Sequence, residues 1–344
     1  MDTLELIVTK IKQVVNDAIL VTLREKNGYL VYYQAGQFLT FILHHDGKEM
    51  RRSYSICSTP GIDEDITILV KRVVNGAISR YLIDHLQPGD QLKALLPAGR
   101  FTLHTDSNDR RTLFFFAAGS GISPVYSLLK QLLYEEPFSK AILIYQNRAE
   151  TSIIFKNELE ALQQSFNERF IWINLLSNPL HKDHIPRRLN NSLLEKMIVP
   201  YFNGDASFNF YICGPASFMR MIQFVLKLLG VTDEHIRKEN FVIDMLPPPP
   251  LITDHSPREV KLRWKEKVFT FSVSYPETIL QAALKHNIQL PFSCRGGRCA
   301  TCSVYCTSGK VKMSVNEVLT AKDMQQGLVL TCVGYAETDL VLQT

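Results

Sequence analysis

The sequence lacks several features that would point to particular classes of protein. No apolar run approaches the length needed to cross a membrane. The N-terminus, MDTLELIVTK, lacks the basic-then-apolar pattern of a secretion signal. The formal net charge of +4 is too small to imply nucleic-acid binding. We therefore expect a cytoplasmic protein with no membrane span and no nucleic-acid partner, and its 344 residues predict roughly two or three domains.

What the sequence does contain is a distinctive cysteine pattern. Cys294, Cys299 and Cys302 follow the spacing C-x4-C-x2-C, and Cys332 follows downstream. This is the thiolate spacing of a plant-type [2Fe–2S] cluster. The glycine pair at residues 296–297 allows the backbone to wrap closely around such a cluster, since glycine accepts backbone angles that other residues resist. We predict that these four cysteines hold a [2Fe–2S] cluster.

Other interpretations of the cysteines fit less well. Structural zinc sites pair one close cysteine pair with a second pair or with histidines, and Cys332 has no close partner in the sequence. The bacterial ferredoxin spacing fails because Gly296 and Thr307 stand where cysteine and proline are needed. A disulfide framework is not expected, because nothing marks the chain as secreted. Cys306 remains as a spare, interpreted as a small half-buried residue rather than a substitute ligand.

Residues 1 to about 106 alternate between apolar and polar positions in short segments, which predicts a small antiparallel β-barrel. Turn signals such as Asn27-Gly28 and Pro88-Gly89 separate the segments. The expected strands are residues 6–15, 18–25, 36–44 and 65–74.

A phosphate-binding and ring-binding pattern lies within this first region. Arg52 and Tyr54 alternate in RRSYS, so a strand would place both on one side. The arginine can clamp a phosphate and the tyrosine can stack on a flat ring. Gly76 and Ser79 begin a predicted short helix, whose N-terminus favours an anion. Singly, Arg52 could be a solvated charge and Tyr54 a core aromatic, but together these residues suit a flavin.

Between residues 110 and 245 the pattern becomes alternating strand and helix, which predicts a doubly wound α/β sheet with its ligand at the carboxyl ends of the strands. The buried-type strand RTLFFFAAG leads into a glycine-rich turn, G-x-G-x-x-P. Such a turn at a helix N-terminus can cradle pyrophosphate. The turn contains Gly119, Gly121 and Pro124.

The family resemblance given below implies a nicotinamide nucleotide, and the choice between NADPH and NADH then depends on how the chain meets the 2′-phosphate that only NADPH carries. Arg148 follows the predicted strand AILIYQ and is placed to take a phosphate, which Lys156 could assist. No acidic residue occupies the immediate strand end, although Glu150 is close. We expect NADPH.

The motifs together resemble the ferredoxin–NADP reductase superfamily. R-x-Y-S followed by G-x-x-S is similar to its flavin domain. That resemblance implies that Arg52 lies near the flavin phosphates, Tyr54 stacks on the isoalloxazine and Ser55 lies near its N5. It also implies that Gly76 and Ser79 bind the pyrophosphate.

A second motif, Cys213-Gly214-Pro215, resembles the nucleotide half of the same superfamily. The resemblance implies that Cys213 lies beside the nicotinamide, near the path of hydride transfer. Without this resemblance, Cys213 would be interpreted as a buried thiol at a strand end. Ser55 and Cys213 are thus the expected catalytic residues, with Gly214 and Pro215 among the nucleotide-binding ones.

The third region follows a run of prolines at residues 247–250, which predicts a stiff spacer of about 12 Å. After it, the predicted hairpin, helix, cysteine loop and final strands resemble a complete plant-type ferredoxin. Basic residues crowd this region, and we expect them to meet an acidic docking face on a partner. They are Lys261, Arg263, Lys265, Lys267, Arg295 and Arg298.

We therefore predict a multi-domain chain. Its parts are an FAD-binding antiparallel β-barrel at 1–106, a doubly wound α/β NAD(P)-binding domain at 110–245, a proline-rich linker at 246–257 and an α+β, β-grasp [2Fe–2S] ferredoxin domain at 258–344. This order resembles the reductase component of the phenylacetyl-CoA epoxygenase system and related reductases of oxygenases, hydroxylases and desaturases. The resemblance implies electron flow from NADPH through FAD and the cluster to such a partner.

Two alternatives remain. A phthalate-dioxygenase-type reductase shares this domain order but uses FMN and NADH. A non-catalytic redox sensor would carry the same cofactors to regulate a partner.

Overall fold

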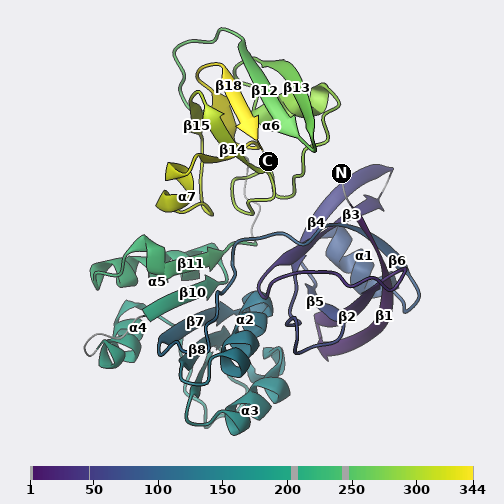
Figure 1. Ribbon diagram of the computed structural model, residues 1–344. Helices are drawn as coiled ribbons and strands as arrows, with labels where there is room; N and C mark the ends of the chain where they lie inside the picture. The colour runs from purple at the N-terminus through teal and green to yellow at the C-terminus, as the bar shows by residue number, and fades with distance from the viewer. Residues whose placement is uncertain (1–2, 46, 203–207, 242–247, 344) are drawn as a thin grey trace. The chain divides into compact units, whose positions relative to one another are not determined.

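The computed structural model describes residues 3–45, 47–202, 208–241 and 248–343. The chain divides into two compact units, and most of their elements are labelled in Figure 1. The larger unit combines Thr3–Pro97 with Phe101–Phe241, and the smaller one contains Ala98–Arg100 and the ferredoxin-like region. Leu246 and Pro247, the first residues of the predicted linker, lie outside the described residues.

Six strands at the start of the larger unit form an antiparallel sheet in the order β4-β3-β6-β1-β2-β5. A bridge between Ile56 and Ile68 joins the end of β4 to β5, so the sheet closes as the predicted barrel. The helix α1 packs Ile78 and Leu82 into the barrel core. The elements are β1 (Thr3–Val15), β2 (Ala18–Glu25), β3 (Phe38–His45), β4 (Lys48–Ser55), β5 (Ile66–Lys71), α1 (Ala77–His85) and β6 (Gln91–Leu95).

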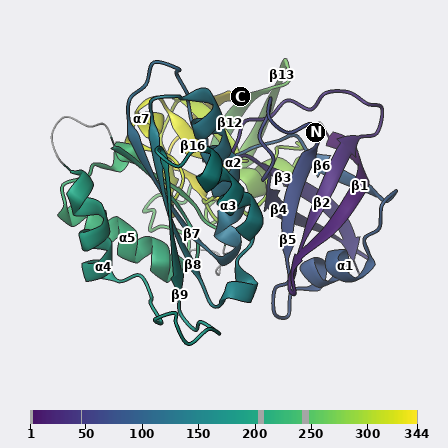
Figure 2. The ribbon, with the colours of Figure 1, turned by 90° about the horizontal axis from the view of Figure 1, so that it is seen from below.

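The rest of the larger unit is a parallel five-stranded sheet in the order β11-β10-β7-β8-β9. Figure 2 shows α2 and α3 on one face of it and α4 and α5 on the other, so the predicted doubly wound fold is confirmed. The elements are β7 (Thr112–Ala118), α2 (Ile122–Glu135), β8 (Lys140–Asn147), α3 (Lys156–Ser165), β9 (Phe170–Leu176), α4 (Asn191–Ile198), β10 (Phe208–Cys213), α5 (Ala216–Leu228) and β11 (Ile236–Glu239), with short 3-10 turns at Gly119–Gly121, Glu150–Ser152, Val199–Tyr201 and Asp233–His235.

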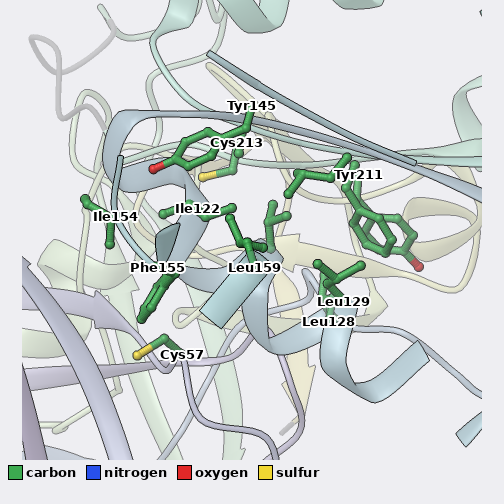
Figure 3. Packing of buried hydrophobic residues seen from close by; sticks show 14 of the residues in the cluster. Cys57, Ile122, Leu128, Leu129, Tyr145, Ile154, Phe155, Leu159, Tyr211 and Cys213 are labelled. Atoms are coloured by element: carbon green, nitrogen blue, oxygen red, sulfur yellow. The ribbon is translucent and has the colours of Figure 1, made fainter. Parts of the chain in front are cut away.

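The central strand β7 is apolar from its second residue, Leu113, to its end because helices cover both of its faces. Phe114 and Phe116 pack with the α4 and α5 side, whereas Leu113 and Phe115 pack with α2 and α3. Figure 3 shows part of the apolar cluster on the α2 and α3 side, in which Cys213 lies beside Tyr145.

The helix α3 begins later than the sequence pattern predicts. The pattern indicates a helix from Ser152, but the helix starts at Lys156. Phe155 precedes it with a φ of 61°, a left-handed backbone angle that no α-helix continues through. Its ring stacks on Tyr126 with centroids 4.3 Å apart, and this packing fixes the break.

The smaller unit contains a five-stranded mixed sheet in the order β13-β12-β18-β14-β16 and a two-stranded ribbon of β15 and β17. Helix α6 packs Ile279, Leu280 and Ala283 into the core of this β-grasp arrangement. The elements are β12 (Arg258–Trp264), β13 (Lys267–Val273), α6 (Ile279–Lys285), β14 (Ser303–Ser308), β15 (Val311–Met313), α7 (Ala321–Gln325), β16 (Leu328–Leu330), β17 (Gly334–Ala336) and β18 (Leu340–Gln343).

Candidate functional site

The carboxyl ends of β7 and β10 form the centre of the candidate site. The two strands are neighbours although the chain passes from β7 to β8, so the strand order reverses between them. Open parallel sheets bind their ligands at such a switch point. Residues 119–124 follow β7, and residues 213–215 end and follow β10. The two predicted nucleotide motifs therefore meet at one edge of the sheet.

These motifs approach each other so closely that glycine is required. A β-carbon on Gly121 would lie 2.2 Å from the carbonyl oxygen of Cys213, which is a direct clash. The Tyr145 hydroxyl donates to the carbonyl of Gly119 at 3.0 Å and holds the other end of the turn. The turn is thus fixed on both sides before any ligand arrives.

The start of α2 suits an anion. The helix has neither a side-chain cap nor an acidic residue in its first turn, so its first N–H groups are not capped by a side chain. Pro124 lies in that first turn, where its missing N–H costs nothing. A pyrophosphate fits this environment, because helix N-termini favour negative charge.

Ser55, at the end of β4, reaches the same place from the barrel. Its hydroxyl donates to Glu239 Oε1 at 3.2 Å. Glu239 ends β11, where it is paired in register with Cys213 of β10. The two expected catalytic residues are therefore linked through a carboxylate that the sequence patterns did not reveal.

Glu239 is an unusual carboxylate. Burial raises its pKa to about 8, against the opposing effect of the Ser55 hydrogen bond. Its second oxygen, Oε2, is buried and has no hydrogen-bond partner among the described residues. Burial raises the pKa of the Cys213 thiol as well, and the nearby Glu239 charge adds to that shift. An unpaired buried carboxyl oxygen next to Cys213 fits a site that receives a polar ring such as a nicotinamide.

The predicted flavin residues Arg52 and Tyr54 lie on β4, both half-buried, with the exposed Ser53 between them. The ring centroids of Tyr54 and Phe41 are 5.9 Å apart. Burial raises the pKa of the Tyr54 hydroxyl to about 12. The Arg52 guanidinium donates to the carbonyl of Arg51 at 2.7 Å. The shared side predicted from alternation is consistent with these positions, while the contacts of both residues with a flavin remain predictions.

Gly76 is the N-cap of α1, which has no side-chain cap and no acid in its first turn. That helix start can accept a phosphate. Ser79 is mostly buried, and its hydroxyl accepts from the Val73 N–H at 3.1 Å. In this structure Ser79 therefore shapes the turn before the helix. Its predicted contact with pyrophosphate stays a prediction.

Arg148 and Lys156 are exposed beyond the carboxyl end of β8. Lys156 lies 3.9 Å from Glu160. Glu150, the nearby acid, is turned to the loop after β9, where it accepts from the Leu180 N–H at 2.8 Å. That backbone bond lowers the pKa of Glu150 to about 2, with help from His184. Glu150 is thus already engaged with its own loop.

A basic pocket near the end of β9 was missed in the sequence. Arg187, Arg188 and Lys196 line it. Gln146, at the end of β8, donates to the carbonyl of Arg187 at 3.2 Å and accepts from the Leu189 N–H at 2.8 Å. The pocket is thereby tied to the ligand-binding edge of the sheet. The signal in the sequence was the adjacent arginine pair in IPRRLNN.

The four predicted cluster ligands come together as two pairs in the smaller unit. Cys294 is hydrogen-bonded to Cys299, and Cys302 to Cys332. Among the described residues no three His, Cys, Asp or Glu side chains converge on a single metal ion. Two thiol pairs suit a cluster of two irons, each of which takes two thiolates, so the donor set fits [2Fe–2S].

The loop that carries the first three of these cysteines, residues 294–302, is tightly wound. The Gly296 N–H donates to Cys294 Sγ at 3.4 Å, a contact of the kind that tunes cluster potential. Gly297 has a φ of 72°, and Arg295 and Ala300 also adopt left-handed angles. Strained angles of this kind persist where a surrounding structure enforces them. The spare Cys306 lies on β14, with its Sγ directed at the Ser308 carbonyl at 3.3 Å.

No helix among the described residues has both the length and the apolar character needed to cross a bilayer.

Comparison with known families assigns each region a type. The oxidoreductase FAD-binding domain matches residues 5–103, and the oxidoreductase NAD-binding domain matches residues 115–224. The 2Fe–2S iron–sulfur cluster binding domain matches residues 262–337. The three predicted kinds of domain are therefore confirmed.

Curated relatives span nearly the whole chain. One component of the 1,2-phenylacetyl-CoA epoxidase of Escherichia coli is 31% identical over 95% of this chain and 93% of its own length. The ferredoxin reductase component of a 3-ketosteroid-9-alpha-monooxygenase of Mycobacterium tuberculosis is 33% identical over 90% of this chain and 84% of its own.

Solved structures share the architecture. Phthalate dioxygenase reductase covers 99% of this chain and 98% of its own at a TM-score of 0.61 and 23% identity. An intact type IV self-sufficient cytochrome P450 monooxygenase covers 99% of this chain and 41% of its own at a TM-score of 0.75 and 22% identity. Likeness at these identities shows the fold alone.

Proposed function

Because this chain belongs to the family of flavin- and iron–sulfur-dependent reductase components of multicomponent oxygenases, we propose that it draws electrons from NADPH and delivers them to an oxygenase, hydroxylase or desaturase partner. The proposed order is NADPH, FAD, [2Fe–2S] cluster, partner. When bound, the nicotinamide supplies a hydride, the flavin converts that electron pair into single electrons, and the cluster carries them one at a time. The chain's own part is to bind, orient and shield these groups.

The hydrogen bond from Ser55 to Glu239 is the observation that carries this proposal. It joins the predicted flavin strand to the strand that is paired with Cys213. Hydride transfer needs its two reacting atoms within about 3.5 Å. Side chains from the flavin half and the nucleotide half converge at Ser55 and Glu239, which supports our placing that contact there. We assign Ser55 and Cys213 to contacts with the reacting rings and Glu239 to orienting the Ser55 hydroxyl.

The remaining residues would hold the groups. We assign Arg52, Tyr54 and the start of α1 to FAD. The residues assigned to the nucleotide are Gly119, Gly121, Pro124, Cys213, Gly214 and Pro215. The thiols assigned to the cluster are Cys294, Cys299, Cys302 and Cys332. No disulfide joins any of the seven cysteines, all of which lie in the described residues, and this suits a reducing compartment; we therefore place the protein in the cytoplasm.

Reduction of two artificial acceptors tests the function. The loaded full-length protein should reduce ferricyanide and cytochrome c with NADPH over many turnovers. Cys294→Ser should abolish cytochrome c reduction, which needs the cluster, and spare ferricyanide, which takes electrons from flavin. Cys306→Ser is the matched control and should retain both activities, because its thiol bonds locally on β14. A single stoichiometric bleach without turnover would instead support a redox sensor.

A second candidate is an FMN- and NADH-dependent reductase. Phthalate dioxygenase reductase, whose type is the alternative raised by the sequence, shares this fold over the whole chain, and the shared fold does not separate FMN from FAD. Mass spectrometry of the flavin released by heat separates the two, since FAD and FMN differ by an adenylate. The uncapped start of α1 supports FAD, because a pyrophosphate offers it a second phosphate.

The partner is proposed to present an acidic docking face. Lys261 and Arg263 project from the exposed side of β12, whose alternate residues Val260 and Leu262 are buried. Arg298 is a weaker contributor, since its side chain is mostly buried and lies 3.3 Å from Glu317. Charge complementarity of this kind chiefly raises the rate of encounter.

A further inference from the structure

Helix α2 carries three buried polar side chains along one face. Ser123, Ser127 and Lys130 follow the spacing i, i+4, i+7, and they are 2%, 0% and 6% exposed. Residues at this spacing share one side of a helix. Buried polar groups destabilise a fold unless they are paired, so each needs a partner. We call these three residues the α2 strut.

The partners of the two serines lie in the segment that begins with Ser55. The Ser123 hydroxyl donates to the carbonyl of Ser55 at 3.1 Å. One turn later, the Ser127 hydroxyl donates to the carbonyl of Ser58 at 2.6 Å. Both bonds run from a side chain of the nucleotide half to the backbone of the flavin half.

The contact continues at the next turn of α2. Lys130 forms an ion pair with Asp63, and it is also stacked over the Tyr126 ring at 4.8 Å. Thr59 returns a bond in the opposite direction, from its hydroxyl to the carbonyl of Ser127 at 3.0 Å. Two turns of helix are thus bonded in register to the segment between residues 55 and 63.

The first turn of α2 therefore contacts both sides of the candidate site. Gly121 packs against the carbonyl of Cys213, while Ser123, two residues later, holds the carbonyl of Ser55. Ser55 is held at both ends, because its hydroxyl bonds Glu239. Apolar packing alone could join the two halves, but it is not directional. The hydrogen bonds join defined atoms, so they also fix how far α2 can slide along residues 55–63.

We propose that Ser123 is a positioning residue for hydride transfer. Its hydrogen bond sets the distance between the Ser55 backbone and the nucleotide-binding turn, and Ser127 supports the same alignment. This inference rests on the proposed function. Binding of the nucleotide at residues 119–124 would then act on the same short piece of helix that places Ser55. The reacting rings would be aligned through α2 rather than by the loose docking of two separate halves.

Rapid-mixing reduction of the flavin by NADPH under anaerobic conditions tests this role in the loaded full-length protein. Ser123→Ala should lower the limiting rate of flavin reduction by about tenfold or more, because small misplacements are costly in such reactions. The Kd for NADPH should change less than about twofold, because the turn itself is intact. The long-wavelength charge-transfer absorbance of the flavin–nucleotide complex should weaken. Ser127→Ala should produce a smaller fall.

Gln131→Ala is the control, since Gln131 lies on the same helix but donates to Glu135 outside the strut. It should leave rate and absorbance unchanged. Amide hydrogen exchange at residues 55–63 gives a readout without activity, and Ser123→Ala should speed it.

The proposal is overturned if Ser123→Ala reduces flavin at the wild-type rate with full charge-transfer absorbance. It is also overturned if only the affinity for NADPH falls. Failure of the wild-type protein to reduce flavin with either NADPH or NADH would be a different result, because it would refute the proposed function itself.

Discussion

At the residue scale, Glu239 illustrates what a single sequence hides. Ser55 and Cys213 lie in recognisable motifs, and the motifs predicted their roles. Glu239 stands in the polar run IRKEN, which has neither spacing nor periodicity to mark it. It becomes visible only when β11 pairs in parallel with β10 and sets it level with Cys213. Such a residue is defined by strand register, which local pattern does not encode.

The raised pKa of Glu239 predicts a pH dependence of stability. Its folded-state pKa is about 8, above the ordinary value of 4.5, so the folded protein holds a proton that the unfolded chain releases. The folded state therefore loses stability as pH rises from about 4.5 to about 8, by on the order of 1 kcal/mol per pH unit. Glu239→Gln should flatten this slope, measured as melting temperature at pH 6 and pH 8 without nucleotide.

Glu234→Gln is the matched control for that measurement, because Glu234 is exposed and near the same strand. It should keep the wild-type slope. A Glu239→Gln protein whose melting temperature falls between pH 6 and pH 8 as much as that of the wild type would contradict the prediction.

Arg148 should decide between the two nicotinamide nucleotides. A charged hydrogen bond contributes about 1.5–3 kcal/mol, so Arg148→Ala should raise KM for NADPH by about tenfold or more. KM for NADH should barely change, because NADH lacks the 2′-phosphate. Steady-state kinetics with each nucleotide measures both.

Lys140→Ala is the control, since Lys140 is an exposed cation at the opposite end of the same strand. Equal effects of Arg148→Ala on both nucleotides would refute the assignment. If Arg188→Ala, rather than Arg148→Ala, raised KM for NADPH alone, the 2′-phosphate would instead bind in the basic pocket that Arg188 lines.

At the element scale, helices and strands with long apolar patterns could be predicted from the sequence, whereas short strands with mostly polar residues could not. β7 and α2 were evident because burial on both faces demands apolar runs. β11 and β14 were missed, since they are short and their residues are mostly polar. The late start of α3 depends on the Phe155–Tyr126 stack, a contact with another helix. The sequence indicates helices over residues 276–287 and 317–325, but caps at Thr278 and Thr320 start α6 and α7 later.

The cluster loop should tolerate a methyl group at one glycine and not at its neighbour. A β-carbon on Gly297 would lie 2.8 Å from both Val315 Cγ1 and the Val315 carbonyl oxygen, and its φ is 72°. On Gly296 the nearest atom would be the Cys294 carbonyl oxygen at 3.7 Å, an ordinary contact. Gly297→Ala should therefore lose at least about half of its bound iron and its paramagnetic signal after reduction, while Gly296→Ala keeps both. Equal iron contents would show that the loop adapts.

At the scale of the whole molecule, the order of three domain types could be predicted because each carries its own motif. Contacts between the flavin half and the nucleotide half could not. Ser123 and Ser55 are 68 residues apart, and both are common serines. Only the packed structure shows that one bonds the backbone of the other.

The proposed docking face predicts a salt-dependent encounter. Charge reversal in Lys261→Glu with Lys267→Glu should lower the rate of electron delivery to the partner by about tenfold at low salt and much less at high salt. Reduction of ferricyanide should be unchanged. Lys10→Glu, an exposed change on β1 in the larger unit, serves as control. A wild-type rate that hardly responds to ionic strength would remove the case for an acidic docking face.

Cys57, Leu69 and Phe101, from the barrel side, lie in one apolar cluster with Leu128 and Leu129 of α2. Unfolding of either half of the larger unit would therefore expose this shared cluster. Calorimetry should record a single endotherm for both halves and a separate one for the ferredoxin-like unit. Removing iron should then lower the temperature of the second endotherm alone.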